Sequence, residues 1–213
     1  MEIAVFQDDF PRPVEGHFKI EVIDKKTQEV IDSYEEKNKI MLGAKVSMQQ
    51  AMRGNATSSG NLIFINTFVL GTRGHENDNL LTPKDFNYNL SDLFAVQESA
   101  PAYPITFDKY GNIIDEGYDP NLPNSAFTDT RVNIYEEADT DRRTIVYEFL
   151  IYEENANNNG NPIAYTEAAL YTNLGQNIDP NNLAYGTIFS MRTFPAKIKD
   201  NTTQLKITWR IIF

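Results

Sequence analysis

Five strand-like segments in the second half of the chain restrict the fold more strongly than any other feature of the sequence. They lie at residues 132–136, 144–153, 165–172, 185–194 and 204–213 and are rich in Ile, Val, Phe, Tyr and Thr. Asn-rich connections separate several of them, notably residues 155–161 and 177–182, where Asn and Gly tolerate positive φ angles. Residues 131–213 are therefore predicted to form an antiparallel sheet or sandwich.

Two further strand signals precede this region. Phe18, Ile20 and Val22 alternate with polar neighbours, and a polar turn at residues 24–28 leads into a second alternating stretch, which predicts a β-hairpin over residues 17–36. Residues 62–70 are apolar almost without interruption. Such a run is typical of a strand that is covered on both faces.

A short helix is predicted at residues 39–53, where apolar residues recur every four positions on one helical face. These residues are Ile40, Ala44, Met48 and Met52. Asn38 is placed to act as the N-cap and Gly54 as the C-terminal cap.

Residues 72–130 hold half of the prolines and many Asn and Asp residues, so they are predicted to form an insertion or an extended arm. A small hairpin is expected within it, with a turn at residues 109–112 between Phe107 and Ile113. The predicted fold is mainly β: one antiparallel β-sandwich domain over residues 1–213, with a single short helix. No repeat of fixed period is present.

The composition sets limits on function. The chain of 213 residues is 41% hydrophobic, which suffices for a core, and its net charge of −11 disfavours a nucleic-acid partner, because phosphate binding needs a basic face. It has no cysteine, so disulfides and thiolate metal sites are excluded, in keeping with folding in a reducing cytoplasm. No apolar run reaches the length of a membrane span or resembles a signal peptide, so no membrane partner and no export are expected.

No established catalytic motif is present, and the only histidines are His17 and His75. Residues 74–79 combine imidazole, carboxylate and amide groups, but they lack the spacing of a calcium loop and are predicted to form a polar turn. Tyr103, Tyr110 and Tyr118 could stack on sugars, although packing is the usual role of aromatic residues. No catalytic, cofactor-binding or metal-binding residue is therefore predicted.

The last fifty residues resemble a pattern found in virion proteins of tailed bacteriophages. An aromatic-x-Glu-small-small-Leu-aromatic strand at residues 165–171 is followed by Thr193-Phe194-Pro195, a Lys-Asp turn and a terminal strand with Trp209. The first half is more weakly similar, at residues 38–40 and 65–71, whereas residues 72–130 depart from the pattern.

This resemblance implies a non-enzymatic structural protein of the neck, collar, tail, baseplate or fibre, made in the host bacterial cytoplasm and incorporated into the virion. It implies a β-sandwich that assembles into rings or trimers with its own copies and with other virion proteins. The candidate assembly residues are Trp209, Phe194, Pro195, Glu167, Leu170 and Tyr171. The alternatives are a receptor- or glycan-binding fibre module and a polysaccharide-degrading enzyme.

Physical chemistry gives independent expectations for the same motif. The alternation in the terminal strand sends Leu205, Ile207, Trp209 and Ile211 to one side, so Trp209 is predicted to be an inward anchor. Pro195 is predicted to end its strand, because proline cannot donate a ladder hydrogen bond.

Overall fold

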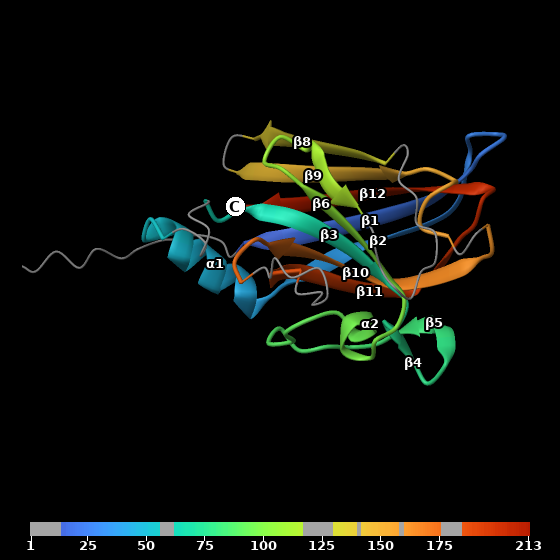
Figure 1. Ribbon diagram of the computed structural model, residues 1–213, viewed down its shortest axis with the longest axis horizontal. Helices are drawn as coiled ribbons and strands as arrows, with labels where there is room; N and C mark the ends of the chain where they lie inside the picture. The colour runs from blue at the N-terminus through green and yellow to red at the C-terminus, as the bar shows by residue number, and fades with distance from the viewer. Residues whose placement is uncertain (1–13, 56–61, 117–129, 140–141, 158–159, 176–184) are drawn as a thin grey trace, which may run out of the picture.

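The computed structural model describes residues 14–55, 62–116, 130–139, 142–157, 160–175 and 185–213, and these residues form an antiparallel β structure with two helices (Figure 1). The strands of the first half are β1 (Glu15–Asp24), β2 (Val30–Ile40), β3 (Ile65–Gly71), β4 (His75–Glu76), β5 (Asn79–Pro83), β6 (Ala102–Phe107) and β7 (Ile113–Glu116). Those of the second half are β8 (Arg131–Ala138), β9 (Arg143–Ile151), β10 (Ile163–Thr172), β11 (Thr187–Lys199) and β12 (Thr203–Ile212). The helices are α1 (Leu42–Met52) and α2 (Phe94–Gln97).

Ten of these strands form one sheet, in the order β7-β6-β3-β10-β11-β2-β1-β12-β9-β8, which is nearly closed into a barrel-like shape (Figure 1). The mainly antiparallel fold is as predicted. The two halves of the sheet meet where β2 pairs with β11, and this ladder contains only the pairs Ser190–Ile40 and Met191–Lys39. Strands β4 and β5 form a separate two-stranded sheet.

The strands predicted from periodicity are confirmed. The first hairpin is β1 and β2, and Asp24 Oδ1 accepts hydrogen bonds from the backbone N–H groups of Lys26 and Thr27 at 2.9 and 2.8 Å, which closes its turn. The apolar run near residue 65 is β3, buried from Asn66 to Gly71. The five predicted segments of the second half correspond to β8 to β12.

The main core lies between the two curved halves and is rich in aromatic rings. Trp209 is fully buried and meets Phe18 edge-on at 4.9 Å between ring centroids, and Phe68 from the other half stacks on Phe149 at 4.2 Å. Leu205, Ile207 and Ile211 share the inward side of β12. The prediction that Trp209 is an inward anchor is confirmed.

Helix α1 differs from its prediction at the N-terminal end. The structure starts it at Leu42 with Met41 as the N-cap, so Ile40 belongs to β2 and lies outside the helix. Asn38 is also in β2, where its Nδ2 donates to Ser190 Oγ at 2.5 Å. Pairing with β1 keeps the backbone extended through residue 38, so its side chain caps no helix. Gly54 takes the positive φ of 71° that its predicted capping role requires.

Pro195 does not end its strand, and this prediction is wrong. Strand β11 continues to Lys199 because Pro195 sits at a register shift, between the pairs Glu167–Thr193 and Tyr165–Lys197. On its other side, β11 pairs with β2 only at residues 190 and 191. Proline is tolerated at a β-bulge where the backbone nitrogen does not have to donate a hydrogen bond to a neighbouring strand.

Part of the predicted insertion joins the main sheet. In the described portion, residues 72–116, strand β6 pairs with β3 along residues 102–106, and β7 extends the sheet beyond β6. The predicted hairpin is confirmed: Asp108 Oδ1 accepts from the N–H groups of Tyr110 and Asn112. Residues 117–129 of the predicted arm, including Tyr118, lie outside the described residues.

Candidate functional site

Residues 72–101, here called the outer segment, cover the face of the sheet opposite to the main core (Figure 1). The outer segment contains β4, β5 and α2, and both of these strands lie against β11. A second apolar cluster joins it to the sheet. Its buried members are Met41, Val69, Phe86, Leu93, Ala95, Ala100, Ala102, Ala169, Tyr171, Tyr185, Ile188 and Met191.

Glu167 is a fully buried carboxylate that fastens the outer segment to β10. Its Oε1 accepts hydrogen bonds from the backbone N–H groups of Ala95 at 2.7 Å and Arg73 at 3.3 Å, and its Oε2 accepts from Phe94 N–H at 2.9 Å. One side chain therefore binds both ends of the outer segment. Gly71 leaves room for it, because a Cβ there would lie 2.6 Å from Oε1.

Burial raises the pKa of Glu167 to about 7, although the three N–H donors and the more distant Lys84 act in the opposite direction. The carboxyl group has no solvent exposure. Its environment suits a structural clasp whose charge changes near neutral pH.

Tyr171 and Asp92 form the second fastening point, four residues further along β10. The Tyr171 hydroxyl donates to Asp92 Oδ1 and accepts from Leu93 N–H at 3.2 Å. Burial raises the pKa of Asp92, and burial together with Asp92 raises that of Tyr171 well above its usual value. Glu167 and Tyr171 thus hold the start of α2 from two positions on the same face of one strand.

The predicted polar turn at residues 74–79 connects β4 and β5, with positive φ angles of 44° and 59° at Asn77 and Asp78. His75 faces the sheet instead of the turn: it is buried, and its Nδ1 lies 3.4 Å from Thr166 Oγ1. Thr166 Oγ1 also accepts from Gly74 N–H at 2.9 Å. Within the described ranges, no group of three or more His, Asp and Glu side chains is arranged to hold a metal ion.

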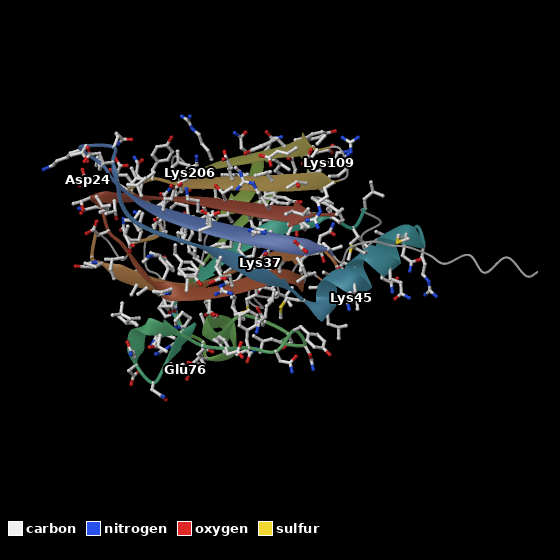
Figure 2. All side chains as sticks on the ribbon, turned by 180° about the vertical axis from the view of Figure 1, so that it is seen from behind. Asp24, Lys37, Lys45, Glu76, Lys109 and Lys206 are labelled. Carbon is white, nitrogen blue, oxygen red and sulfur yellow. The ribbon has the colours of Figure 1, made fainter. Side chains whose placement is uncertain are left out.

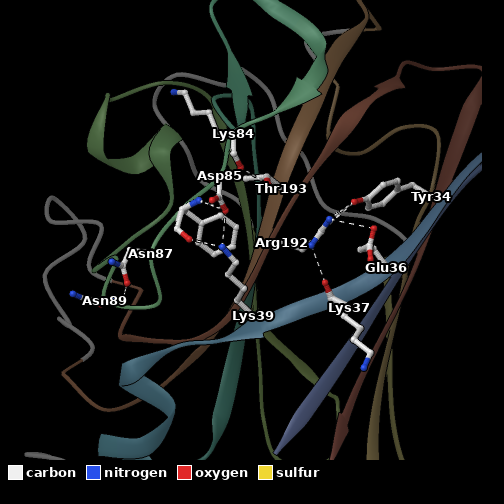
Figure 3. A network of polar contacts seen from close by, with 11 residues as sticks. Tyr34, Glu36, Lys37, Lys39, Lys84, Asp85, Asn87, Asn89, Arg192 and Thr193 are labelled. Atoms are coloured by element: carbon white, nitrogen blue, oxygen red, sulfur yellow. Dashed lines mark hydrogen bonds and ion pairs between the residues drawn. The ribbon is translucent and has the colours of Figure 1, made fainter.

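The seam between β2 and β11 carries polar contacts on both of its faces (Figure 3). On the side of the outer segment, Lys39 Nζ binds Asp85 Oδ1 at 2.6 Å and the carbonyl of Phe86. Thr193 Oγ1 donates to the carbonyl of Lys84 at 2.7 Å. These bonds extend the fastening of the outer segment onto β2 and β11.

On the other side of the seam, Arg192 replaces the missing ladder between β11 and β2 (Figure 3). Its guanidinium donates to the carbonyl of Lys37 at 2.9 Å and to the Tyr34 hydroxyl at 3.1 Å, and it lies 3.6 Å from the Glu36 carboxylate. Further along, Lys197 Nζ bridges the same seam to Asp32 at 2.8 Å. Long basic side chains therefore hold the two halves together where backbone pairing stops.

A further buried charge lies at the C-terminal end of β11. Lys199 is fully buried and donates to the carbonyls of Glu153 and Asp200 at 3.0 and 2.7 Å, and burial lowers its pKa to about 7. The Glu153 carboxylate binds Lys25 at 2.6 Å and Gln204 at 2.9 Å, and these hydrogen bonds lower its pKa to about 2. These groups tie three turns of the sheet together.

The surface of the outer segment displays apolar side chains. Leu80, Leu81 and Tyr88 are 40%, 73% and 57% exposed. Tyr103 is fully buried in the main core, in keeping with the packing role that the sequence favours over sugar stacking, whereas Tyr110 is 72% exposed. The outer segment is hydrogen-bonded to the sheet on its inner side and exposes apolar side chains on its outer side. Such a surface is suited to contacting another protein.

The candidate assembly residues fall into two groups on neighbouring strands. Leu170, Phe194 and Trp209 point into the main core, where Phe194 stacks on Phe18 at 5.2 Å. Glu167 and Tyr171 point outward and hold the outer segment. Pro195 is half-buried at the bulge between these regions.

Sequence reasoning missed Asp92, Thr166, Lys39 and Arg192. Thr166 and Arg192 lie inside the recognised motif, so their positions could have suggested a role. Lys39 lies in the more weakly similar stretch at residues 38–40, and its partner Asp85 is 46 residues away. Asp92 carries no such signal, because its partner Tyr171 is 79 residues away in the chain.

Comparison with known proteins gives no match to a family model, to a curated protein or to a solved structure. Neither described helix is long and apolar enough to span a membrane.

Proposed function

We propose that this protein is a structural component of a tailed-phage virion, which assembles at the neck and collar or at the tail and baseplate through contacts between subunits. The observation that carries the proposal is the role that two residues of the phage-like motif play in the fold. Glu167 and Tyr171 fasten an outer segment that presents Leu80, Leu81 and Tyr88 to its surroundings. The motif residues therefore serve to build and display a contact surface.

The proposal includes a finer description of the fold and assigns no catalysis. The two halves of the sheet, which share the main core and are joined by the short β2–β11 ladder, correspond to the two layers of a β-sandwich. The buried titratable groups Glu167, Tyr171 and Lys199 act as structural bonds. The partners are further copies of the chain and other virion proteins, and the site of function is the assembled particle.

Localisation on intact particles tests this proposal directly. A gold-labelled antibody against the protein should bind particles at the neck or at the baseplate, which are well separated in electron micrographs. Disabling the protein should give detached heads and tails or tails without complete baseplates. Particles of normal morphology that bear no label would overturn the proposal.

A receptor- or glycan-binding module is the alternative, and one observation favours it. Tyr110 is 72% exposed at the tip of the β6–β7 hairpin, beside Lys109, whose Nζ lies 4.9 Å from the ring centroid. An exposed aromatic ring at a hairpin tip could stack on a sugar. Complete particles that fail to adsorb after Tyr110→Ala would support this alternative, whereas a joint protein predicts normal adsorption.

A further inference from the structure

Helix α1 has apolar side chains on two opposite faces, although only one face contacts the other described residues. Toward the body, Ala44 and Ser47 are buried, and Gly43 lies so close to β11 that a Cβ would be 2.2 Å from the carbonyl oxygen of Ile188. On the outer face, Leu42, Val46 and Met52 are 45%, 40% and 88% exposed. A helix that is apolar on both sides is typical of one that is buried on both sides.

The outer face of α1, here defined as Leu42, Lys45, Val46, Gln49, Met52 and Arg53, lies at one end of the molecule (Figure 2). Tyr88 extends this surface, because its carbonyl accepts the hydrogen bond of Leu42 N–H at 2.9 Å and its side chain is 57% exposed. The helix contains no acidic residue, whereas the chain as a whole has a net charge of −11. The surface is therefore apolar and basic on an otherwise acidic protein.

We infer that the outer face of α1 docks onto strand β8 of a second copy of this chain. The inference rests on the proposed function, because it names the contact through which copies would assemble. The charges of α1 decide the geometry. Two copies of α1 packed on each other would oppose Lys45 and Arg53 with like charges, so a symmetric helix–helix contact is unfavourable.

Strand β8 offers the complementary surface. Among the described residues it pairs only with β9, so it is an edge strand of the sheet. Its last four residues are all exposed, and they include Tyr135, Glu136 and Glu137. Covering an edge strand with a helix is a common way to prevent uncontrolled pairing. Here the helix would bring cations to Glu136 and to Glu137, whose carboxylate also lies 3.5 Å from Arg210 Nε of its own chain.

The contact joins two different surfaces, so each copy uses its helix on one neighbour and its strand on the other. Such a heterologous arrangement generates a ring when the rotation closes. A ring is one of the assemblies that the phage resemblance implies.

Charge reversal provides a test with an internal rescue. One variant carries Lys45→Glu and Arg53→Glu, the other carries Glu136→Lys and Glu137→Lys, and Lys26→Glu in the exposed β1–β2 turn is the control. Each double variant alone opposes like charges across the contact and should self-associate about a hundredfold more weakly than the wild type in sedimentation equilibrium. Mixing the two variants restores opposite charges at each contact between unlike variants, so association between the two should return.

The result that supports the inference is loss in each variant, recovery in the mixture and no change in the control, with thermal melts showing that all variants are folded. The inference is overturned if the wild type is monomeric at the highest soluble concentration. It is also overturned if either double variant associates like the wild type, or if the folded variants fail to assemble when mixed. Antibody labelling of particles tests the proposed virion role separately, so failure of one does not imply failure of the other.

Discussion

Leu170 and Tyr171 are adjacent in β10, yet they belong to two regions that are held together by different forces. Leu170 points into the main core, where aromatic and aliphatic side chains from both halves of the sheet pack against one another. Tyr171 points into the outer segment, which hydrogen bonds from Glu167, Tyr171, Thr166 and Thr193 attach to the sheet. The core depends on apolar area, whereas the outer segment combines its own apolar cluster with a few polar side chains that each bind backbone groups.

This difference predicts different consequences of damage. Apolar packing is shared among many side chains, so a cavity in the main core weakens every strand that lines it. The hydrogen bonds of one polar side chain, such as Glu167, act at a single point. Their loss should therefore loosen the outer segment while the sheet stays folded. The experiments below separate these outcomes.

Trp209→Ala should have the largest effect, because Trp209 is fully buried and contacts rings from β1 and β3. The expected loss of unfolding free energy is about 3–5 kcal/mol, from lost transfer energy and an unfilled cavity. Denaturant unfolding measures it. Because Trp209 is the only tryptophan, the wild-type emission should be blue-shifted and should move to longer wavelength only on unfolding.

Trp209→Phe is the matched control. Trp209 Nε1 is buried without a hydrogen-bond partner among the described residues, so phenylalanine removes an unsatisfied donor while it keeps an aromatic ring. Its cost should be clearly smaller than that of alanine. Water-like fluorescence from the folded wild type would contradict the core assignment of Trp209.

The pH dependence of stability should come next, through Glu167. The folded state raises its pKa from 4.5 to about 7, so it binds a proton more tightly than the unfolded chain does. The resulting stabilisation is complete below pH 4.5 and is lost as the pH rises toward 7, by a total of about 3 kcal/mol. Asp92, whose pKa is also raised, contributes in the same direction.

Glu167→Gln isolates this contribution, because glutamine keeps the shape but does not titrate. Urea unfolding at several pH values should show wild-type stability falling between pH 4.5 and 7 relative to the variant. Glu153, with its pKa lowered to about 2, acts below that window. A constant difference between the two proteins across the window would show that Glu167 does not titrate there.

Tyr171→Phe should have a smaller and more local effect. It removes one hydroxyl that donates to Asp92 and accepts from Leu93 N–H, while Leu93 N–H keeps its bond to Asp92 Oδ1 at 2.9 Å. The expected cost is about 1 kcal/mol. Hydrogen exchange should accelerate at Leu93, Phe94 and Ala95 and stay unchanged in β12; uniform acceleration would show that the clasp is part of the global unfolding unit.

The same contrast explains what the sequence could predict. Two strands and their inward sides could be predicted from the alternation of apolar and polar residues: β1, with Phe18, Ile20 and Val22, and β12. Such a periodicity reflects burial on one face. The contacts of Glu167 have no such signature. Its donors are the backbone groups of Phe94, Ala95 and Arg73, and every residue except proline carries a backbone N–H, so no side-chain pattern marks them.

The predictions for Asn38 and Pro195 failed for a related reason. Local propensity favours Asn38 as a helix cap and Pro195 as a strand end, but distant strands decide both positions. Pairing of β2 with β1 keeps Asn38 extended, and the register shift against β10 removes the need for an N–H at Pro195. Tertiary contacts of this kind cannot be read from neighbouring residues.

Pro195→Ala should have the smallest effect and tests the bulge itself. If the backbone at position 195 has no ladder bond to make, alanine adds only flexibility to the unfolded chain and lowers stability by about 0.5–1 kcal/mol. Pro104→Ala is the matched control, because Pro104 lies opposite Val69 in β6, while the described residues of β7 pair with residues 105–107. The two variants should lose similar amounts in denaturant unfolding. A more stable Pro195→Ala protein would mean that the new N–H finds an acceptor in β10 or β2. The register shift at position 195 would then be caused by the proline and not imposed by the surrounding strands.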